Sequence, residues 1–404
     1  MTEQTNTPEL RFPEFDGEWE EKQLNNIVDS LKGNSNDNEE LPVLTISAKK
    51  GWLNQKERFS QVIAGNSLSK YNELKKGDLS YNKGNSKVAL YGIVYKLNFD
   101  RALVPNVYKS FRPKSNYESD FIEKYFHTKI LDKQLRKLIT STARMDGLLN
   151  ISDNDFYSIL INIPTKKEQQ KIGKFFSKLD RQIELEEQKL AKLEEQKKGY
   201  MQKIFSQELR FKDKNGNEYP KWEVIKLKDI LSERKEYASK IGNYPHATLS
   251  TSGISLKSDR YNRDFLVKDK NKKYKVTIMN DICYNPANLK FGVITRNHIG
   301  SVIFSPIYIT FEVNNAHSPL FIELLVTRND FINRVRKYEE GTVYERMAVK
   351  PEDFLNYETK IPCLEEQEKI GDFFSKLDEV INKQSQKIDE LKLRKQGFLQ
   401  KMFV

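Results

Sequence analysis

The sequence has few cysteines and no long hydrophobic run. Cys283 and Cys363 are the only two cysteines in 404 residues, too few for the disulfide framework of a secreted domain, and they favour a reducing cytoplasm. No apolar stretch approaches the roughly 18 residues of a membrane-spanning helix. The first eight residues are polar, so we expect no secretory signal and a cytoplasmic protein without membrane association.

The motifs of common cofactor-dependent enzymes are also missing. No two glycines are spaced G-x-G, which excludes the dinucleotide fingerprint and its methyltransferase analogue, and no Gly-Lys-Ser/Thr is present for a Walker A loop. The four histidines, His127, His246, His298 and His317, do not combine with cysteines at zinc spacing. We therefore expect no catalytic residue, no metal site and no cofactor in this chain.

Two segments partly match catalytic motifs. Residues 285–288, Asn-Pro-Ala-Asn, are similar to the Asn-Pro-Pro-Tyr loop of adenine methyltransferases but lack its second proline and its aromatic residue. Asp353, Glu358 and Lys360 follow the order of a metal-dependent nuclease site, yet the internal repeat preserves neither Glu358 nor Lys360. A standalone DNA-modifying or DNA-cleaving enzyme is therefore the alternative interpretation.

The sequence does contain a long internal repeat. Residues 163–205 align without a gap with residues 361–403, at an offset of 198, and about half of the aligned positions are identical. Shorter matches extend upstream, where Leu-Arg-Phe at 10–12 recurs at 209–211 and Asp-Leu-Ser-Tyr-Asn at 78–82 corresponds to Asp-Ile-Cys-Tyr-Asn at 281–285. Each half is therefore a divergent globular domain followed by a well-matched tail.

Both tails have the heptad spacing of a coiled coil. Apolar residues recur at alternating steps of four and three without an intervening proline, which predicts a helix of about 60 Å for some 40 residues. Glu186 and Gln384 occupy equivalent polar positions, where they can fix the register. Because one chain holds two similar seams, we expect the tails to pack against each other antiparallel rather than each on its own domain. The predicted apolar seam consists of Ile172, Phe176, Leu179, Ile183, Leu190, Leu193, Ile370, Phe374, Leu377, Ile381, Ile388 and Leu391.

The globular parts show short apolar runs separated by turn residues. Runs at 43–46, 88–91, 92–95, 293–295 and 302–304 predict strands, and 120–140 and 319–337 predict helices. The fold class is therefore α+β: two pseudo-twofold-related α/β domains with mixed or antiparallel sheets, joined by two long helices that form an antiparallel coiled coil. We place the boundaries at 1–162, 163–206, 207–360 and 361–404.

The net charge of +11 is unevenly distributed. Residues 33–165 and 206–363 each carry about +6, the first tail about +4 and the second tail about zero, while residues 1–32 are acidic. Two equally basic globular bodies are expected of two anion-binding modules.

Loops rich in lysine, arginine, serine and asparagine recur at matching places in both halves. Such side chains neutralise phosphates and pair with base edges, and glycines allow close backbone approach, so the loops predict contacts with double-stranded DNA. The candidate DNA-binding residues are Ser47, Lys49, Lys50, Trp52, Lys83, Asn85, Ser86, Lys87, Arg144, Ser250, Thr251, Ser252, Lys257, Arg260, Asn285, Asn288, Lys290, Tyr344 and Arg346. Two unlike readers at a fixed separation fit an asymmetric target, whereas a homodimer is limited to palindromes. A coiled-coil scaffold without DNA binding is a further alternative.

The whole pattern resembles the specificity subunit of type I restriction-modification systems. The residues that carry the resemblance are the opening Leu-Arg-Phe-Pro-Glu-Phe at 10–15 with Trp19, and the two Ile-Pro segments at 163 and 361, each followed by Glu-Gln-x-Lys-Ile-Gly. The resemblance covers essentially the whole chain.

The resemblance implies two target recognition domains, each reading half of a bipartite asymmetric DNA site, and a coiled coil that sets the spacer. It also implies that the subunit is not catalytic. Two modification subunits would methylate adenine with S-adenosylmethionine. Two restriction subunits would translocate and cleave DNA with ATP and Mg²⁺. Phe175 and Phe373, beside the seam, are candidates for partner contact or for a wider coil core.

Overall fold

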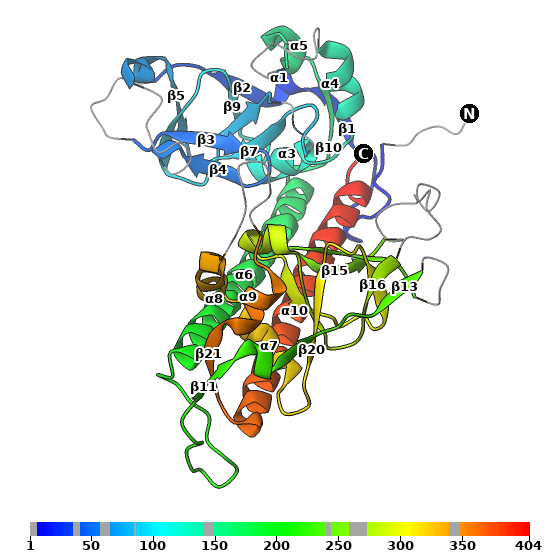
Figure 1. Ribbon diagram of the computed structural model, residues 1–404. Coiled ribbons are helices and arrows are strands. Elements are labelled where there is room, and N and C mark those ends of the chain that lie inside the picture. Colours follow the sequence, from blue (N-terminus) through cyan, green and yellow to red (C-terminus); the bar gives the residue numbers. More distant parts are fainter. Residues whose placement is uncertain are drawn as a thin grey trace. The chain divides into compact units, whose positions relative to one another are not determined.

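The computed structural model describes residues 6–34, 41–56, 65–84, 86, 88–139, 149–239, 244–257, 273–338 and 348–404. It divides into two compact units (Figure 1). Unit 1 comprises Met1–Leu190 and Gln384–Val404, and unit 2 comprises Ala191–Lys383. Each unit therefore contains one globular body together with parts of both long helices.

The globular body of unit 1 is built from short strands with helices packed against them. Its strands are β1 (Glu20–Gln23), β2 (Val28–Leu31), β3 (Leu44–Ser47), β4 (Gly51–Asn54), β5 (Asn72–Lys75), β6 (Leu79–Asn82), β7 (Ile93–Lys96), β8 (Arg101–Val104), β9 (Lys109–Pro113) and β10 (Leu160–Ile163). Its helices are α1 (Leu24–Ile27), η1 (Gly65–Lys70), α3 (Ser119–Phe126), α4 (Asp132–Leu138) and α5 (Asp153–Tyr157). The long helix α6 (Lys166–Phe205) follows β10.

Unit 2 repeats this order of elements. Its strands are β11 (Glu223–Lys226), β12 (Leu231–Glu233), β13 (Tyr237–Ser239), β14 (Ala247–Ser250), β15 (Gly253–Leu256), β16 (Lys273–Thr277), β17 (Ile282–Tyr284), β18 (Ile294–Arg296), β19 (Val302–Phe304), β20 (Ile309–Val313) and β21 (Glu358–Ile361). Its helices are η2 (Leu227–Asp229), η4 (Pro286–Phe291), α7 (Pro319–Val326), α8 (Asn329–Val335), η5 (Arg336–Tyr338) and α9 (Pro351–Asn356). The second long helix, α10 (Leu364–Lys401), follows β21.

Three sheets correspond between the two units, and the fourth is β5-β8 in unit 1 but β13-β16-β19 in unit 2. A four-stranded sheet runs β2-β9-β6-β7 in unit 1 and β12-β20-β17-β18 in unit 2. The two-stranded sheet β1-β10 corresponds to β11-β21, and the hairpin β3-β4 corresponds to β14-β15. All these pairs are antiparallel, so the predicted α+β class is confirmed and the internal repeat is a repeat of structure.

Some sequence-based boundaries differ from the structure. The predicted strand at 88–91 is a turn, because Ser86 and Ala89 bond each other's backbone and Val88 and Leu90 expose their side chains. The predicted helix at 120–140 is interrupted between α3 and α4. Helices α6 and α10 lie inside the predicted 163–206 and 361–404 segments. The domain boundaries themselves remain a prediction.

The Glu-Gln-x-Lys-Ile-Gly segment attaches each long helix to its own globular body. Glu168 is fully buried and accepts two bonds of 2.8 Å from Arg11. Gln169 accepts a bond from the backbone N–H of Glu118 at 3.0 Å, just before α3. A Cβ on Gly173 would lie 2.7 Å from the Cβ of Asp120, so only glycine allows α6 to approach α3 this closely.

Unit 2 repeats these three contacts with equivalent residues. Arg210 donates to buried Glu366 at 3.1 and 2.5 Å, and Gln367 accepts from the N–H of Ser318 at 3.0 Å. A Cβ on Gly371 would lie 2.8 Å from the Cβ of Leu320. The sequence motif that recurs in the two tails is therefore a docking device between helix and domain.

The two long helices pack antiparallel within unit 1. Phe175 contacts Phe398 with ring centroids 5.1 Å apart, and Glu186 accepts a bond of 2.7 Å from the amide of Gln384. As the residue number rises along α6, that of its partner falls along α10, which confirms the predicted antiparallel direction. Glu186 and Gln384 are equivalent positions of the repeat, so here one seam residue meets its own counterpart.

Unit 2 has its own antiparallel contacts between these helices. Tyr200 lies 5.2 Å from Phe373 between ring centroids, and Lys197 pairs with Asp378. All the predicted seam residues are buried or half-buried. The seam therefore stabilises the pair by removing apolar surface from water.

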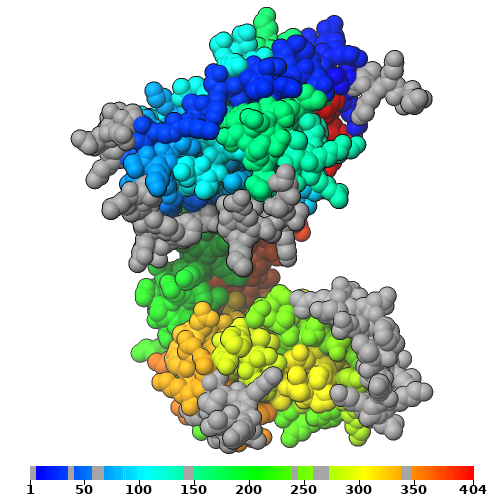
Figure 2. All heavy atoms as spheres, turned by 90° about the horizontal axis from the view of Figure 1, so that it is seen from above, coloured from blue at the N-terminus to red at the C-terminus, as the bar shows by residue number. Residues whose placement is uncertain are grey.

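The ends of both helices complete the hydrophobic cores. In unit 1, Phe403 packs against Trp19 and Phe121, and the hydroxyl of Tyr125 donates to the carbonyl of Val404 at 2.6 Å. Figure 2 shows the red C-terminal end of the chain beside the blue N-terminal segment, where the N–H of Leu10 donates to the carbonyl of Lys401 at 2.8 Å.

In unit 2, Phe205 at the end of α6 packs against Trp222 and Phe321. These are the equivalents of the Phe403 contacts in unit 1. Among the described residues, no helix is both long enough and apolar enough to cross a bilayer.

Candidate nucleic-acid interface

A β-hairpin presents the first predicted loop in each unit. The hairpin β3-β4 is held by Tyr108, whose hydroxyl lies 2.9 Å from the Thr45 hydroxyl and 3.1 Å from the N–H of Ile46. In unit 2, Tyr308 and Thr248 make the equivalent contact at 3.4 Å on the hairpin β14-β15. The two units therefore hold the same hairpin with the same pair of residue types.

The tip of the first hairpin is cationic. Lys49 and Lys50 are exposed, and the Ser47 hydroxyl accepts from the N–H of Lys50 at 3.3 Å. Tyr95 donates its hydroxyl to the carbonyl of Ala48 at 3.0 Å, and burial raises the pKa of this phenol to about 12. The tip thus presents two lysines on a supported turn, as a phosphate-binding loop requires.

Trp52 has a structural role in this hairpin. Its indole N–H donates to the carbonyl of Lys96 at 3.0 Å, and its half-buried ring packs against the cluster beneath the hairpin. The indole N–H of Trp52 thus has a partner within the protein, and DNA contact by this residue stays a prediction.

The tip of the second hairpin is neutral. Ser250 and Ser252 lie 2.9 Å apart between hydroxyl oxygens, and Thr251 and Ser252 are exposed. Lys257, just after β15, is also exposed. This tip offers hydroxyl donors and acceptors in place of the two lysines of unit 1.

The second predicted loop follows the central strand β6 or β17. In unit 1, the Asn82 amide donates to the carbonyl of Ile46 at 3.0 Å, which ties this loop to the hairpin. The carbonyl of Lys83 accepts from the N–H of Leu149 at 2.8 Å. The Ser86 hydroxyl accepts from the N–H of Ala89 at 3.1 Å.

In unit 2, the corresponding loop contains η4. The carbonyl of Pro286 accepts from the N–H of Val349 at 3.4 Å, which is equivalent to the bond between Lys83 and Leu149. Asn288 is half-buried, and Lys290 is exposed with its ammonium 5.1 Å from the ring centroid of Phe291.

Asn285 has a structural role at the start of this loop. It is buried, with 7% exposure, and its side-chain oxygen accepts from the N–H of Ala287 at 3.2 Å at the start of η4. This bond uses the asparagine to begin a turn, which is a common structural role of the residue. The DNA-binding role of Asn285 stays a prediction.

Six other candidates lie outside the described residues: Asn85, Lys87, Arg144, Arg260, Tyr344 and Arg346. Their proposed role stays a prediction.

A lysine-lined cleft in unit 1 was largely missed by the sequence analysis. It has a volume of about 410 Å³, and its lining includes Lys32, Lys70, Lys83 and Lys109. Asp153 pairs with Lys32 at 2.8 Å and with Lys109 at 2.5 Å. Hydrogen bonds from Lys109 and Lys32 lower the pKa of Asp153 to about 2.

Of the four lysines that line this cleft, only Lys83 belongs to a loop that the sequence predicts to bind DNA. The other lysines come from β2, η1 and β9 or the residues beside them, and only the fold brings them together. The sequence carried no local signal for this cluster. Its excess of positive charge adds a second anion-binding surface beside the predicted loop.

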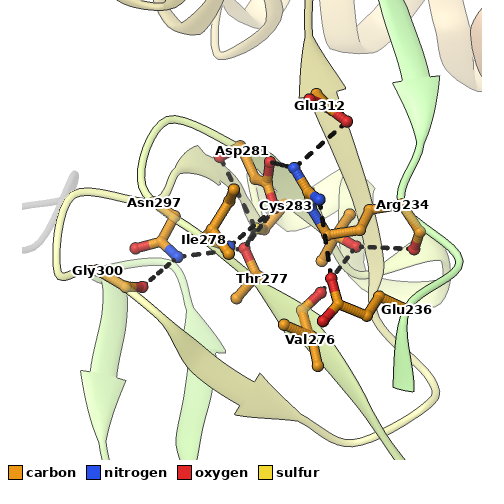
Figure 3. A network of polar contacts seen from close by, with 11 residues as sticks. Arg234, Glu236, Val276, Thr277, Ile278, Asp281, Cys283, Asn297, Gly300 and Glu312 are labelled. Atoms are coloured by element: carbon orange, nitrogen blue, oxygen red, sulfur yellow. Dashed lines mark hydrogen bonds and ion pairs between the residues drawn. The ribbon is translucent and has the colours of Figure 1, made fainter. Parts of the chain in front are cut away.

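A buried polar network supports the central strands of unit 2 (Figure 3). Arg234 donates to both carboxylate oxygens of Asp281 at 2.8 and 3.0 Å, and the hydroxyl of Thr277 donates to the same carboxylate at 3.2 Å. Burial raises the pKa of the Cys283 thiol, which lies 3.2 Å from the Thr277 hydroxyl. Cys283 also packs with Ala247 and other residues of the hairpin, so the network fixes the hairpin on the sheet.

Unit 1 has a comparable buried polar network that is built from other residues. Buried Asp78 accepts from Arg112 at 2.6 and 2.8 Å, and Ser80 lies 2.8 Å from Ser110 between hydroxyls. The aspartate is shared by both units, but its arginine comes from β9 in unit 1 and from the residue after β12 in unit 2.

The site has the composition of a binding surface. Among the described residues, no group of three or more histidine, cysteine, aspartate or glutamate side chains could hold a metal ion. The half-buried His127 has a ring nitrogen 2.7 Å from the carbonyl oxygen of Val94, and burial lowers its pKa to about 4. The exposed groups are lysines, hydroxyls and amides, which bind phosphates and base edges.

Comparisons with known proteins agree with this picture. A sequence profile described as "Type I restriction modification DNA specificity domain" matches residues 16–195. The putative type I restriction enzyme MjaX specificity subunit of Methanocaldococcus jannaschii is 27% identical over 220 residues, covering 49% of each chain. The MjaVIII specificity subunit of the same organism is 22% identical over 286 residues, covering 64% of this chain and 65% of the relative. The matches thus span less than two thirds of either relative.

Two solved structures share the fold over nearly the full length. The type I restriction-modification S subunit from M. genitalium has a TM-score of 0.60 at 15% identity, covering 98% of this chain and 99% of that chain. A chain from a structure of type I R-M complex assembly and conformational transition has a TM-score of 0.50 at 14% identity, covering 95% and 97%. These structures show that the two-domain architecture with long helices is an established fold.

Proposed function

We propose that the chain is the sequence-specific DNA-recognition subunit of a type I restriction-modification complex, and its similarity to the specificity subunits of such systems supports this. Each globular body reads one half of a bipartite asymmetric DNA site. The antiparallel helices set the spacer between the half-sites and recruit the modification subunits.

The observation that carries this proposal is that the two units share the hairpin and its supporting contact but differ in the residues at the hairpin tip. Both units hold an equivalent hairpin with a tyrosine–threonine contact, yet Lys49 and Lys50 at one tip are replaced by Thr251 and Ser252 at the other. An equivalent scaffold with unlike contact residues is what two readers of different DNA sequences need.

The partners and cofactors form the finer part of the proposal. Two modification subunits bind S-adenosylmethionine and methylate adenine, and two restriction subunits use ATP and Mg²⁺. The absence of G-x-G and Gly-Lys-Ser/Thr motifs from the sequence supports assigning these groups to the partners. The chain itself is then a non-catalytic subunit that acts in the cytoplasm.

Exchange of the hairpin tips tests the proposal. We expect the variant K49T/K50S, expressed with the complete system, to alter or abolish recognition of one half-site and to leave the other half-site unchanged. Methylation-sensitive long-read sequencing of the host DNA reports both half-sites at once. The matched control is K189T/K192S, which removes two exposed lysines from α6. A change in both half-sites, or in neither, would contradict the assignment of this tip to one half-site.

The spacer role has a separate test. Insertion of one heptad into each of α6 and α10 keeps the seam in phase. It should lengthen the spacer between half-sites without changing their sequences, and an unchanged spacer would refute the ruler role.

The standalone-enzyme alternative is not favoured. The purified chain, incubated with DNA and either Mg²⁺ or S-adenosylmethionine, should neither cleave nor methylate it. Turnover that persists in a preparation free of partner subunits would overturn the non-catalytic assignment.

A further inference from the structure

An exposed groove lies on α6 in unit 1, away from the candidate DNA-binding loops in the sequence. Its volume is about 440 Å³, and we call it the lysine groove. Phe12 and Phe175 line its apolar part. Its rim carries four lysines, Lys167, Lys171, Lys174 and Lys178, which follow one face of the helix at steps of four, three and four.

The floor of the lysine groove is aromatic and only half-buried. Phe12 and Phe175 meet edge to face with centroids 6.0 Å apart, and Phe175 continues to Phe398 at 5.1 Å. The ammonium of Lys171 lies 4.8 Å above the ring of Phe12 and also pairs with Glu14. A partner that covers these rings would gain from the removal of apolar surface from water.

Unit 2 has the same aromatic floor with a different rim. Phe211 meets Phe373 at 5.6 Å, and Tyr200 meets Phe373 at 5.2 Å. At the repeat offset of 198, Glu365 and Asp372 stand in place of Lys167 and Lys174. Lys369 and Lys376 preserve the other two lysines, so the rim changes from four positive charges to none in sum.

We propose that the lysine groove binds an amphipathic protein segment with apolar and acidic side chains, and that the equivalent face of α10 binds the same segment more weakly. The inference rests on the proposed function, which supplies the modification subunit as the partner present in two copies. The two copies then bind with unequal affinity, the first in the lysine groove and the second on the equivalent face of α10, whose rim charges sum to zero.

The aromatic floor favours a protein segment over a nucleic-acid backbone. Phosphates would neutralise the lysines but would leave Phe12 and Phe175 in contact with water. An acidic amphipathic helix satisfies both parts of the surface, since its apolar side chains cover the rings and its carboxylates face the lysines.

The purified modification subunit of the same system is the probe. Titrated onto the full chain and followed by native mass spectrometry at rising salt, it should give complexes with two copies at low salt and one copy at intermediate salt, because screening weakens exposed charge pairs. The variant K167E/K174D, which copies the unit 2 rim, should lower the tighter affinity by about tenfold and remove the one-copy plateau.

The reverse exchange E365K/D372K is the matched variant. It should strengthen the weaker site and make both copies resist salt. All four substituted side chains are exposed, and thermal unfolding by circular dichroism verifies that each variant remains folded.

The outcomes separate the inference from the proposed function. Loss of both copies at one salt concentration in the unaltered chain, with two copies bound at low salt, overturns the inference alone. Weakened nonspecific DNA binding by K167E/K174D with unchanged salt dependence of the two copies also overturns it in favour of a DNA surface. Failure of the modification subunit to bind at any salt concentration overturns both.

Discussion

Glu123 in unit 1 and Glu323 in unit 2 occupy equivalent positions but differ in their neighbours. Each carboxylate accepts from the backbone N–H of a basic residue, Lys96 at 2.9 Å and Arg296 at 3.1 Å. In unit 1, buried Lys124 bridges Glu123 at 2.6 Å and Asp180 at 2.8 Å. In unit 2, the equivalent of Lys124 is the partly buried Leu324.

The comparison teaches how the repeat tolerates divergence. The backbone contact to the glutamate is kept in both units, while its side-chain cation differs: Lys124 pairs with Glu123 in unit 1, and Arg296 pairs with Glu323 at 3.0 Å in unit 2. The repeat therefore keeps a cation beside this glutamate but supplies it from helix α3 in unit 1 and from strand β18 in unit 2. The removal of a single partner is costly, however, because it leaves a charge buried without compensation.

The largest effect is expected for Lys124→Leu, which introduces the unit 2 residue but leaves Glu123 without a cation like Arg296, because the equivalent Lys96 pairs with Asp120. Burial opposes ionisation of Glu123, yet Lys124 and the other neighbours hold its pKa below the ordinary value. Without Lys124 the carboxylate loses its main compensation, and the free energy of unfolding should fall by about 3 to 5 kcal/mol. Urea denaturation of the full chain measures the loss.

The double variant E123Q/K124L is the control for this prediction. It removes the uncompensated charge together with the lysine, and Asp180 still has Lys395 at 2.5 Å. It should recover a large part of the lost stability. A loss below about 1 kcal/mol for Lys124→Leu, the range of exposed pairs, would mean that the cluster behaves as a surface ion pair.

The arginines that donate to the buried glutamates of the long helices, Arg11 to Glu168 and Arg210 to Glu366, offer a second comparison of the units. Glu366 accepts from Arg210 and also lies 3.3 Å from the indole N–H of Trp222, whereas the indole nitrogen of Trp19 has no hydrogen-bond partner in unit 1. Arg11→Met should therefore destabilise the protein more than Arg210→Met, by up to about 3 kcal/mol for loss of a hydrogen bond to a charged group. Thermal unfolding of the two variants provides the comparison, and equal losses would contradict a stabilising role of Trp222.

Glycine substitutions test the close approach of helix and domain. Gly173→Ala places a Cβ 2.7 Å from Asp120 and Gly371→Ala places one 2.8 Å from Leu320, and overpacking of this kind costs about 1 to 3 kcal/mol. Gly199→Ala and Gly397→Ala are matched controls, since no atom lies within 4 Å of their added Cβ. The controls should stabilise the helices by about 0.5 to 1 kcal/mol, as alanine in place of a helical glycine does. Unfolding curves in urea distinguish the two signs.

Much of this architecture could be predicted from the sequence, because repeats and heptads are local patterns. The seam from Ile172 onward and the antiparallel direction follow from periodicity and from the presence of two similar tails. The lysines around Asp153 could not be predicted, since residues from separate elements meet there only after folding. The bonds of Trp52 and Asn285 could not be predicted for a related reason, because a polar side chain in a loop can bind the protein's own backbone as well as a ligand.

The smallest effect concerns the acid stability of unit 1. Hydrogen bonds from Lys109 and Lys32 lower the pKa of Asp153 to about 2, below the ordinary aspartate value of 3.8. The pair therefore stabilises the folded state fully at pH values above the unfolded pKa, and this contribution is lost as the pH falls through the folded pKa. Because the carboxylate is 46% exposed, solvent screening limits the contribution to less than about 1 kcal/mol.

Asp153→Asn should remove this contribution, so the free energy of unfolding should fall slightly at pH 6 and stay unchanged near pH 2. Asp330→Asn provides a second, non-equivalent case in unit 2, where Arg328 lowers the pKa of Asp330 to about 2. Urea denaturation at both pH values tests the sign, and a loss that is larger at pH 2 than at pH 6 would refute the ionic origin of the contact.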